Sequence, residues 1–495
     1  MVSLNGEDDM TDIADRPTTT TPGAREEVDR SNGTRPVPHP DGERLEELAR
    51  RHLWMHFSRM GHFQHAEVPT IVRGDGCHVW DQHGRQYLDG LSGLFVSQIG
   101  YGRRELADIA AQQAETLHYF PVWSYAHPPA IELAARLAEL APGELNRVFF
   151  TVSGSEAVES ALKLARQYHR VMGEPGRYKV ISRATAYHGV SLGALAITGV
   201  PALRTPFEPM PGGFPKVPNT NQYRPAFPGL EGEALTDALV ASLEQAILTE
   251  GPETVAAVFM EPMQNAGGCL TPPTSSYFPK VREVCDRHGV LLVSDEVICA
   301  FGRLGTMFGC ERYGYEPDII TVAKGLTSGY SPLGAAICSD RLIEPFLSDE
   351  RAAFAHGITF GGHPVSCAVG LANLDVMARE SVVANVAAHE GYFGELLAGL
   401  RDLRIVGDTR GDGYFRAIEL VKDAETKERF SRDEVERLLR GTIAPRMYEL
   451  GLIARVDDRG DPVIQFAPPL IAGRAELEQI AETMRTVLTE ASASV

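Results

Sequence analysis

The stretch DIITVAKGLTSG at residues 318–329 is a short apolar run, rich in β-branched residues, that ends on a single lysine and continues into glycines. This pattern predicts a buried strand that ends just before Lys324. An ammonium group taken out of water loses its solvation, so its pKa falls and the neutral amine becomes a nucleophile. The alternative is that Lys324 begins a loop and keeps its charge in solvent.

A second predicted strand, VLLVSDEV at residues 290–297, ends on an acid. Burial of Asp295 costs free energy unless it meets a cation or hydrogen-bond donors, although an aspartate in this place can also cap a turn. An acid and a lysine at two strand ends of one sheet are what an aldehyde cofactor with a pyridine nitrogen requires. The lysine forms the Schiff base, and the acid keeps the ring nitrogen protonated.

The predicted sheet extends over residues 145 to 340, where short β-rich runs alternate with helical patterns. Strands separated by helix-length connections indicate a mostly parallel sheet with helices on its faces. In such sheets the ligand crevice lies at the carboxyl ends of the strands. Polar residues gather at the predicted strand ends, and they are Ser153 to Ser155, Tyr187, His188, Glu261, Gln264, Asp295 and Lys324.

An anion site is predicted in TVSGSEAVESALKLA at residues 151–165. Small, flexible residues stand here between a strand and a long amphipathic helix, so backbone N–H groups and the helix N-terminus can meet a phosphate. Glu156 just inside the helix complements the helix dipole, which is equally true of a plain helix start. The motif by itself therefore leaves both interpretations open.

Composition bounds the remaining possibilities. The chain has 495 residues, a formal net charge of -19 and 43% hydrophobic residues, which is ordinary for a globular protein and disfavours a nucleic-acid partner. Seven scattered cysteines without a CxxC pair, and a first segment without an apolar core, predict a reducing, cytoplasmic setting. The uncharged stretch 184–203 contains too many glycines and hydroxyls for a membrane span, so we expect it inside the protein and expect no membrane partner.

The domain organisation follows from the same patterns. Residues 1–40 are rich in Thr, Pro, Asp and Glu and predict a disordered tail. Residues 41–95 and 365–495 have mixed strand and helix character and predict a smaller α+β domain built from both chain ends. Residues 96–364 then form the large cofactor-binding domain, so the expected fold class is α/β with a mostly parallel mixed sheet.

Six segments of the chain together carry a resemblance to a known family. They are VFFTVSGSEAVESALKLAR at 148–166, YHG at 187–189, EPMQNAGG at 261–268, LLVSDEVICAFGRLGTMFG at 291–309, PDIITVAKGLTSGYSPLGA at 317–335 and GITFGGHPVSCA at 357–368. In order and spacing they resemble the class III aminotransferases, from about residue 45 onward. These are fold type I enzymes that use pyridoxal 5'-phosphate (PLP).

The resemblance implies a role for each matching position. Lys324 would carry the cofactor and move the proton, and Asp295 would pair with the pyridine nitrogen. The other implied cofactor contacts are Gly154 and Ser155 for the phosphate, Tyr187 and Val297 for the two ring faces, Gln264 for the phenolic oxygen, Glu261 within the third segment, and Thr359 for the phosphate of the neighbouring subunit. The family pattern therefore implies a homodimer with shared active sites, and the sequence leaves open whether dimers pair into tetramers.

The residues expected to contact the substrate match some members of the family and differ from others. Relatives that act on amino acids with a distal carboxylate often carry EGEGG in the third segment, but this chain has QNAGG with Ala266 in place of the second glutamate. That difference resembles the amine:pyruvate enzymes, the ω-transaminases, in which Arg455 would be the flexible arginine that binds the pyruvate carboxylate. Phe57, Phe95 and Trp123 match pocket walls. The alternatives are a solvated arginine on an edge strand and ordinary core aromatics.

The sequence thus predicts a PLP-dependent aminotransferase that moves an amino group from a primary amine or ω-amino acid to pyruvate by a ping-pong mechanism. Alternatives on the same fold are a decarboxylating transaminase, an aminomutase and a phospholyase, because the cofactor supports all these reactions. A catalytically silent scaffold is the alternative from another class. No metal is expected, because His52 and His56 lack a third ligand nearby and HExxH is absent.

Overall fold

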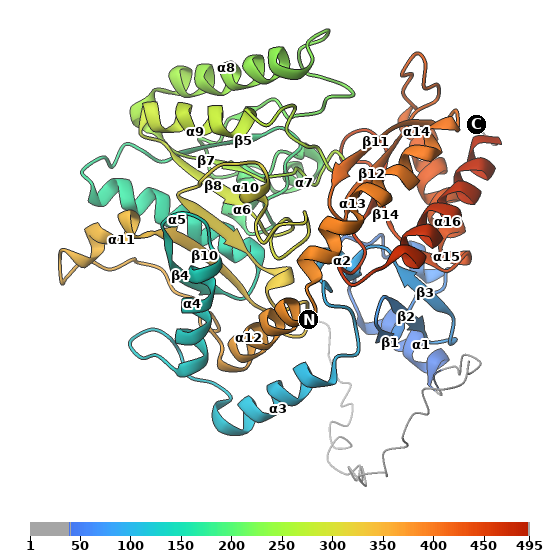
Figure 1. Cartoon of the computed structure of the whole chain (residues 1–495), viewed down its shortest axis with the longest axis horizontal. Coiled ribbons are helices and arrows are strands. Elements are labelled where there is room, and N and C mark those ends of the chain that lie inside the picture. Colours follow the sequence, from blue (N-terminus) through green and yellow to red (C-terminus); the bar gives the residue numbers. More distant parts are fainter. Residues whose placement is uncertain (1–38, 40, 494–495) are drawn as a thin grey trace, which may run out of the picture. The chain divides into compact units, whose positions relative to one another are not determined.

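The computed structural model describes residues 39 and 41–493, so the tail predicted over residues 1–40 lies outside it except for residue 39. A seven-stranded sheet forms the centre of the larger part of the described chain (Figure 1). Its strand order is β4 (Leu145–Thr151), β10 (Gly334–Ser339), β9 (Ile319–Val322), β8 (Leu291–Asp295), β7 (Val255–Met260), β5 (Lys179–Arg183) and β6 (Lys216–Val217). Strands β9, β8, β7, β5 and β6 are parallel, whereas β10 pairs antiparallel with both of its neighbours.

Both faces of this sheet are covered by helices, because successive side chains of a strand point to opposite sides. On β7, Ala257 and Phe259 pack in the core cluster of helix α5, while Val258 and Met260 pack with helices α8 and α9. The surrounding helices are α3 (Arg104–Leu117), α4 (Pro128–Leu140), α5 (Gly154–Val171), α6 (Leu192–Ile197), α7 (Pro201–Arg204), α8 (Gly232–Glu250), α9 (Tyr277–His288), α10 (Gly309–Arg312), α11 (Asp340–Leu347) and α12 (Pro364–Arg379). This arrangement confirms the predicted α/β sheet.

Two four-stranded sheets are built from the ends of the chain. The first contains β1 (Ile71–Asp75), β2 (His78–Asp81), β3 (Gln86–Asp89) and β13 (Leu452–Ile453), and the second contains β11 (Val406–Asp412), β12 (Phe415–Leu420), β15 (Val463–Phe466) and β14 (Arg455–Asp457). In Figure 1 the blue β3 lies beside red C-terminal elements, because β13 pairs parallel with it. The predicted α+β part from both chain ends is therefore confirmed, whereas its exact boundaries stay predictions.

The helices of this part are α1 (Gly42–His52), α2 (Ser92–Phe95), α13 (Val382–Ala398), α14 (Arg432–Glu436), α15 (Ala444–Glu449) and α16 (Arg474–Ala493), with a π-helical turn at Arg437–Ile443. Helix α16 buries Leu477, Ile480, Met484 and Val487 completely, as their spacing of three and four residues predicts. The helix thus closes the core of the C-terminal part.

The middle of the uncharged stretch 184–203 lies inside the protein, as predicted, whereas Val190, Leu192, Pro201 and Ala202 are exposed. Helix α6 in its middle buries every residue from Gly193 to Ile197 against the large sheet. None of the helices in residues 41–493 is both long and apolar enough to cross a membrane.

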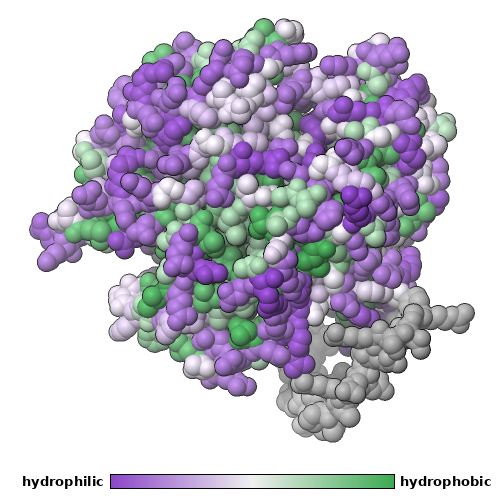
Figure 2. Space-filling model, viewed as in Figure 1, coloured by the Kyte–Doolittle hydropathy of each residue, from purple (hydrophilic) through white to green (hydrophobic). Residues whose placement is uncertain are grey.

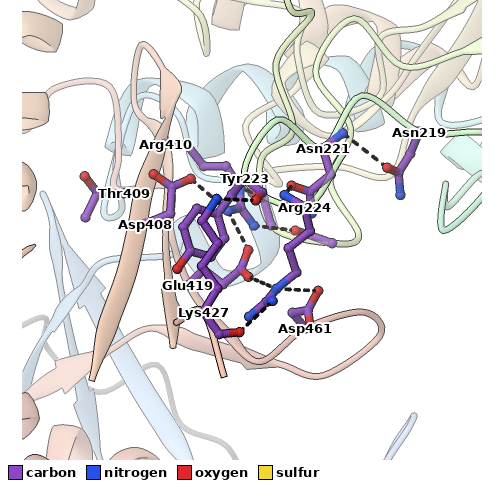
Figure 3. A network of polar contacts seen from close by, with 12 residues as sticks. Asn219, Asn221, Tyr223, Arg224, Asp408, Thr409, Arg410, Glu419, Lys427 and Asp461 are labelled. Carbon is purple, nitrogen blue, oxygen red and sulfur yellow. Dashed lines mark hydrogen bonds and ion pairs between the residues drawn. The ribbon is translucent and has the colours of Figure 1, made fainter. Parts of the chain in front are cut away.

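A buried network of ion pairs and hydrogen bonds fixes the loop after β7 to the second four-stranded sheet, which contains β11 and β12 (Figure 3). Arg410 on β11 donates to the backbone carbonyls of Gly267 and Gly268 at 2.7 and 2.6 Å. Its guanidinium also donates to Glu419, a fully buried carboxylate that accepts from Arg224 at 2.8 Å through its other oxygen. Asp408 lies 3.0 Å from Arg410 and Asp461 lies 3.3 Å from Arg224, so Glu419 is the shared carboxylate that ties two distant segments together.

Glu419→Gln should lower the free energy of unfolding by about 3 kcal/mol, because it removes the fully buried carboxylate that the two mostly buried guanidinium groups share and leaves each with one acid, Asp408 or Asp461. Urea denaturation followed by circular dichroism measures this change. Glu283→Gln on the exposed face of α9 is the matched control and should stay within about 0.5 kcal/mol of the wild type. Equal stability of the two variants would contradict the role of the network.

Candidate active site

A cavity of about 350 Å³ opens at the carboxyl ends of the parallel strands. Its wall includes residues that come from four strand ends and from the start of α5. Those that the sequence singled out are Ser153, Gly154, Ser155, Tyr187, His188, Glu261, Asp295, Val297 and Lys324. The fold therefore brings these predicted polar residues to one place, as the rule for open α/β sheets requires.

Lys324 lies two residues after the end of β9 and has a positive φ of 45°, which turns the chain sharply there. Its Nζ has no hydrogen-bond or ion-pair partner among the residues that the structure describes. The Lys324 pKa is lowered to about 8, mainly by burial and also by Arg455, whereas Asp295 and Glu261 act in the opposite direction. An amine that is partly neutral near pH 8 and has no partner is available as a nucleophile and as a proton carrier.

Asp295, at the end of β8, is held from three sides. His188 Nδ1 lies 2.7 Å from one carboxylate oxygen, while the hydroxyl of Thr321 and the backbone N–H of Val297 each donate to the other at 3.2 Å. The side chain of His188 is completely buried. This fixed carboxylate in the cavity wall suits a pyridine nitrogen, because it sustains the protonated ring.

The start of α5 forms a tight anion cradle. A Cβ at Gly154 would lie 2.7 Å from Val297 Cγ1, so only glycine fits between this valine and the helix start. Ser153 is the N-cap, and Ser155 Oγ accepts from the backbone N–H of Ser191 at 2.9 Å. The first N–H groups of a helix have no intrahelical partner, and they point toward an anion at this end.

Tyr187 lines the cavity and is supported by charged groups. The guanidinium carbon of Arg459 lies 5.4 Å from the centre of the Tyr187 ring. Glu261 Oε1 accepts weakly from the backbone N–H of Tyr187 at 3.4 Å, and its Oε2 accepts from that of Asn265 at 2.8 Å. Burial raises the Glu261 pKa. Glu261 thus shapes the loops around the cavity.

Gln264 is not among the residues that line the cavity, and its predicted contact with the cofactor stays a prediction. It is fully buried, and its amide nitrogen donates to the backbone carbonyls of Ala184 and Ala266, both at 3.1 Å. A contact between this amide and a ring oxygen would require it to leave both carbonyls. The local turn is closed by a bridge between Gln264 and Leu270, and the amide oxygen of Gln264 is buried without a hydrogen-bond partner among the described residues.

The predicted substrate residues fall into two groups. Phe95 and Ala266 are buried, and Arg455 lies partly buried with its guanidinium carbon 5.7 Å from the centre of the Phe95 ring. Phe57 and Trp123 are instead 77% and 66% exposed, and Thr359 is also exposed. None of these six residues is among those that line the cavity of about 350 Å³, so their predicted roles stay predictions.

Three supporting residues were not assigned roles from the sequence: His188, Thr321 and Arg459. His188 follows Tyr187 in the YHG motif, which left a core role and a catalytic role equally open. Thr321 lies on β9 opposite Asp295 in the strand register, a pairing that single-sequence reasoning cannot assign. The only feature of the sequence that could have indicated Arg459 is its position four residues after Arg455.

The lysine, the fixed acid and the glycine-lined helix start together define a PLP site of the transaminase type. The aminotransferase class-III family matches residues 62–488, and the chain belongs to this family. PLP is accordingly its cofactor, and the residues of the cavity fit it, because the Gly154 cradle and the partnerless Lys324 would otherwise be costly to maintain.

Relatives and solved structures agree with this assignment. "Probable aminotransferase Rv3329" of Mycobacterium tuberculosis is 58% identical over 93% of this chain and 97% of its own. A putrescine–pyruvate and a β-alanine–pyruvate aminotransferase of Pseudomonas aeruginosa are each 36% identical, over 90% and 89% of this chain and 96% of each relative.

Among solved structures, a thermostable (S)-enantioselective ω-transaminase from Thermomicrobium roseum has a TM-score of 0.87 at 42% identity, covering 91% of this chain and 98% of its own. The ω-transaminase from Pseudomonas jessenii in complex with PMP has a TM-score of 0.86 at 35% identity, with the same two coverages.

The rate at which the cofactor-free protein takes up PLP should rise with pH to about 8 and then level off, because only the neutral Lys324 amine attacks the aldehyde. Stopped-flow absorbance between pH 6 and about 10 measures this rate. The reaction of PLP with a free lysine derivative in the same buffers corrects for the ionisation of PLP itself. A rate that still climbs steeply between about pH 9 and 10, toward the ordinary lysine pKa of about 10.4, would contradict a lowered Lys324 pKa.

Gly154→Ala should weaken PLP retention about tenfold, because the added methyl group meets Val297. Equilibrium dialysis against PLP measures the effect. The double variant Gly154→Ala with Val297→Ala should recover most of it, and Gly441→Ala, where a methyl group meets open space, is the control. Undiminished retention in Gly154→Ala would contradict the cradle.

Proposed function

We propose that this class III aminotransferase moves an amino group from a primary amine or ω-amino acid to pyruvate by a ping-pong mechanism. The observation that carries the proposal is the partnerless Lys324 amine, with its pKa lowered to about 8, in one cavity with the fixed carboxylate of Asp295. The pyruvate acceptor is supported by the names of two relatives, the putrescine–pyruvate and β-alanine–pyruvate enzymes.

Each group of the chain has a defined task in this proposal. When bound, PLP supplies an electron-withdrawing ring that stabilises negative charge on the substrate carbon. Asp295, fixed by His188, would keep the ring nitrogen protonated. Gly154 and Ser155 would bind the phosphate through the helix start, while Tyr187 and Val297 would enclose the ring. Lys324 Nζ would take the proton from the substrate carbon in one half-reaction and return it in the other.

The substrate end of the site would be built around Arg455. Its guanidinium can bind the pyruvate carboxylate through two parallel hydrogen bonds, while Phe95 behind it offers an apolar wall for a carboxylate-free amine. Ala266 leaves no acid to neutralise the arginine from the third motif. The relatives with diamine and amino-acid donors are equally similar, so both donor classes enter this proposal.

We further propose a homodimer with shared sites. Thr359 is exposed outside the cavity of its own chain, which suits a residue that reaches the phosphate of a neighbouring subunit. Phe57 and Trp123, exposed as large aromatic side chains, suit the same interface. A cytoplasmic location is proposed on the seven cysteines, all of which are free and buried.

Lys324→Ala should retain the fold but lose turnover, because no other amine of the described residues lines the cavity. Borohydride reduction followed by peptide mass analysis should locate PLP on Lys324 in the wild type and on no residue of the variant. Lys163→Ala on the exposed face of α5 is the control and should behave as the wild type. An active Lys324→Ala variant would contradict the assignment.

Visible absorbance of the PLP-loaded protein separates the reaction classes. We expect an amine donor to bleach the cofactor band and pyruvate to restore it, without release of carbon dioxide. Carbon dioxide release would favour a decarboxylating transaminase. A band that no donor bleaches would favour an aminomutase or phospholyase, and a band that never forms would favour a silent scaffold.

A further inference from the structure

Two arginines share one carboxylate beside the cavity. Asp457, at the end of β14, is nearly inaccessible to solvent. Arg459 binds it through Nε, which lies 2.9 and 3.0 Å from the two carboxylate oxygens, through Nη2, and through its backbone N–H at 3.0 Å. Arg455 reaches the same carboxylate only at 3.5 Å and makes no hydrogen bond with it.

The cluster of Asp457, Arg455 and Arg459 therefore carries a net positive charge. One carboxylate faces two guanidinium groups, and all three side chains are largely buried, so one positive charge lacks a close counter-charge. The geometry assigns the surplus to Arg455, because Arg459 makes the short contacts. Burial lowers the Arg455 pKa to about 10, and the neighbouring Arg459 contributes in the same direction.

Acids of the cavity wall have other partners. Asp295 is bound by His188 and Thr321, and Glu261 accepts from two backbone N–H groups. These two are the acids that line the cavity in the described chain. The ring of Phe95 lies under Arg455 and offers no full negative charge. A distal ammonium group on a substrate would accordingly meet cations at this end, and a distal carboxylate would meet an available guanidinium.

We propose that Arg459 is a positioning residue that, by binding Asp457, leaves Arg455 free as an uncompensated cation, so that the site selects a carboxylate-bearing substrate over a diamine. This inference rests on the proposed function, because it assumes that Arg455 faces the substrate. It narrows the amine donor to ω-amino acids and monoamines, because a diamine would bring a second ammonium group to Arg455. Arg459 also supports Tyr187 from above its ring, so both contacts of Arg459 serve the same site.

The test uses the PLP-loaded enzyme in four forms: wild type, Arg459→Gln, the double variant Arg459→Gln with Asp457→Asn, and the control Arg432→Gln. Without Arg459, Asp457 is free to pair with Arg455, so we expect the KM for pyruvate to rise about tenfold or more. The KM for an aryl-alkyl amine without a carboxylate should change less than about twofold. Removal of Asp457 in the double variant should return the pyruvate KM to near the wild-type value.

Recovery of the pyruvate KM in the double variant distinguishes a positioning role of Arg459 from a structural one. If Arg459 were only structural, the second substitution would add to the loss of stability and would not restore the KM. Arg432 lies nearby on the exposed start of α14, and its replacement should leave every constant unchanged. Thermal unfolding of all four forms shows whether each one is folded. An unchanged pyruvate KM in Arg459→Gln, or a double variant that is no better than the single one, would overturn the proposal.

Two further measurements separate this inference from the proposed function. The wild type should use β-alanine in preference to putrescine, and putrescine as the better donor would overturn the inference while leaving transamination intact. Calorimetric titration with propionate, which carries a carboxylate and no amine, tests the carboxylate site without turnover. Weaker propionate binding in Arg459→Gln that the double variant restores would support the inference even in a protein that transfers no amino group to pyruvate.

Discussion

The cost of placing an amine without a partner in a protein interior is the constraint around which this molecule is built. Lys324 is tolerated where it lies because Asp295 and Glu261 offset part of the desolvation of its ammonium group. Asp295 in turn depends on the parallel pairing of β8 and β9, whose register puts Thr321 opposite it. The seven-stranded sheet thus serves as the rigid frame for one acid and one amine.

The site also requires that the N-terminal and C-terminal parts of the chain pack together beside the seven-stranded sheet. Strand β13 joins β3 across more than half of the sequence, and β14 follows at once with Arg455 and Asp457. The ion network around Glu419 fixes the same part of the protein to the loop after β7. Residues of three separate sheets therefore hold the two sides of the site, which gives the substrate end a different origin from the cofactor end.

Much of the cofactor side could be predicted from the sequence, because its residues lie at strand ends and at a helix start, and these have local signals. The apolar runs before Asp295 and Lys324 and the small residues before α5 predicted positions that the cavity confirms. The cofactor contact of Gln264 stays a prediction: its amide nitrogen donates to the backbone carbonyls of Ala184 and Ala266, and no periodicity encodes that choice. Phe57, Trp123 and Thr359 lie outside the cavity of their own chain, so their predicted roles depend on a neighbouring subunit.

The sequence by itself determined the strand ends, the start of the long helix after Ser153 and the family, because these depend on short patterns of burial and backbone freedom. Only the tertiary structure decided which side chains stabilise the reactive ones. His188 could have been a core histidine until the fold placed its Nδ1 against Asp295. The division of Asp457 between Arg455 and Arg459 is likewise a matter of tenths of an ångström between groups on one strand and the turn after it. Charge balance at a buried site depends on distances, and distances are fixed only when the whole chain is packed.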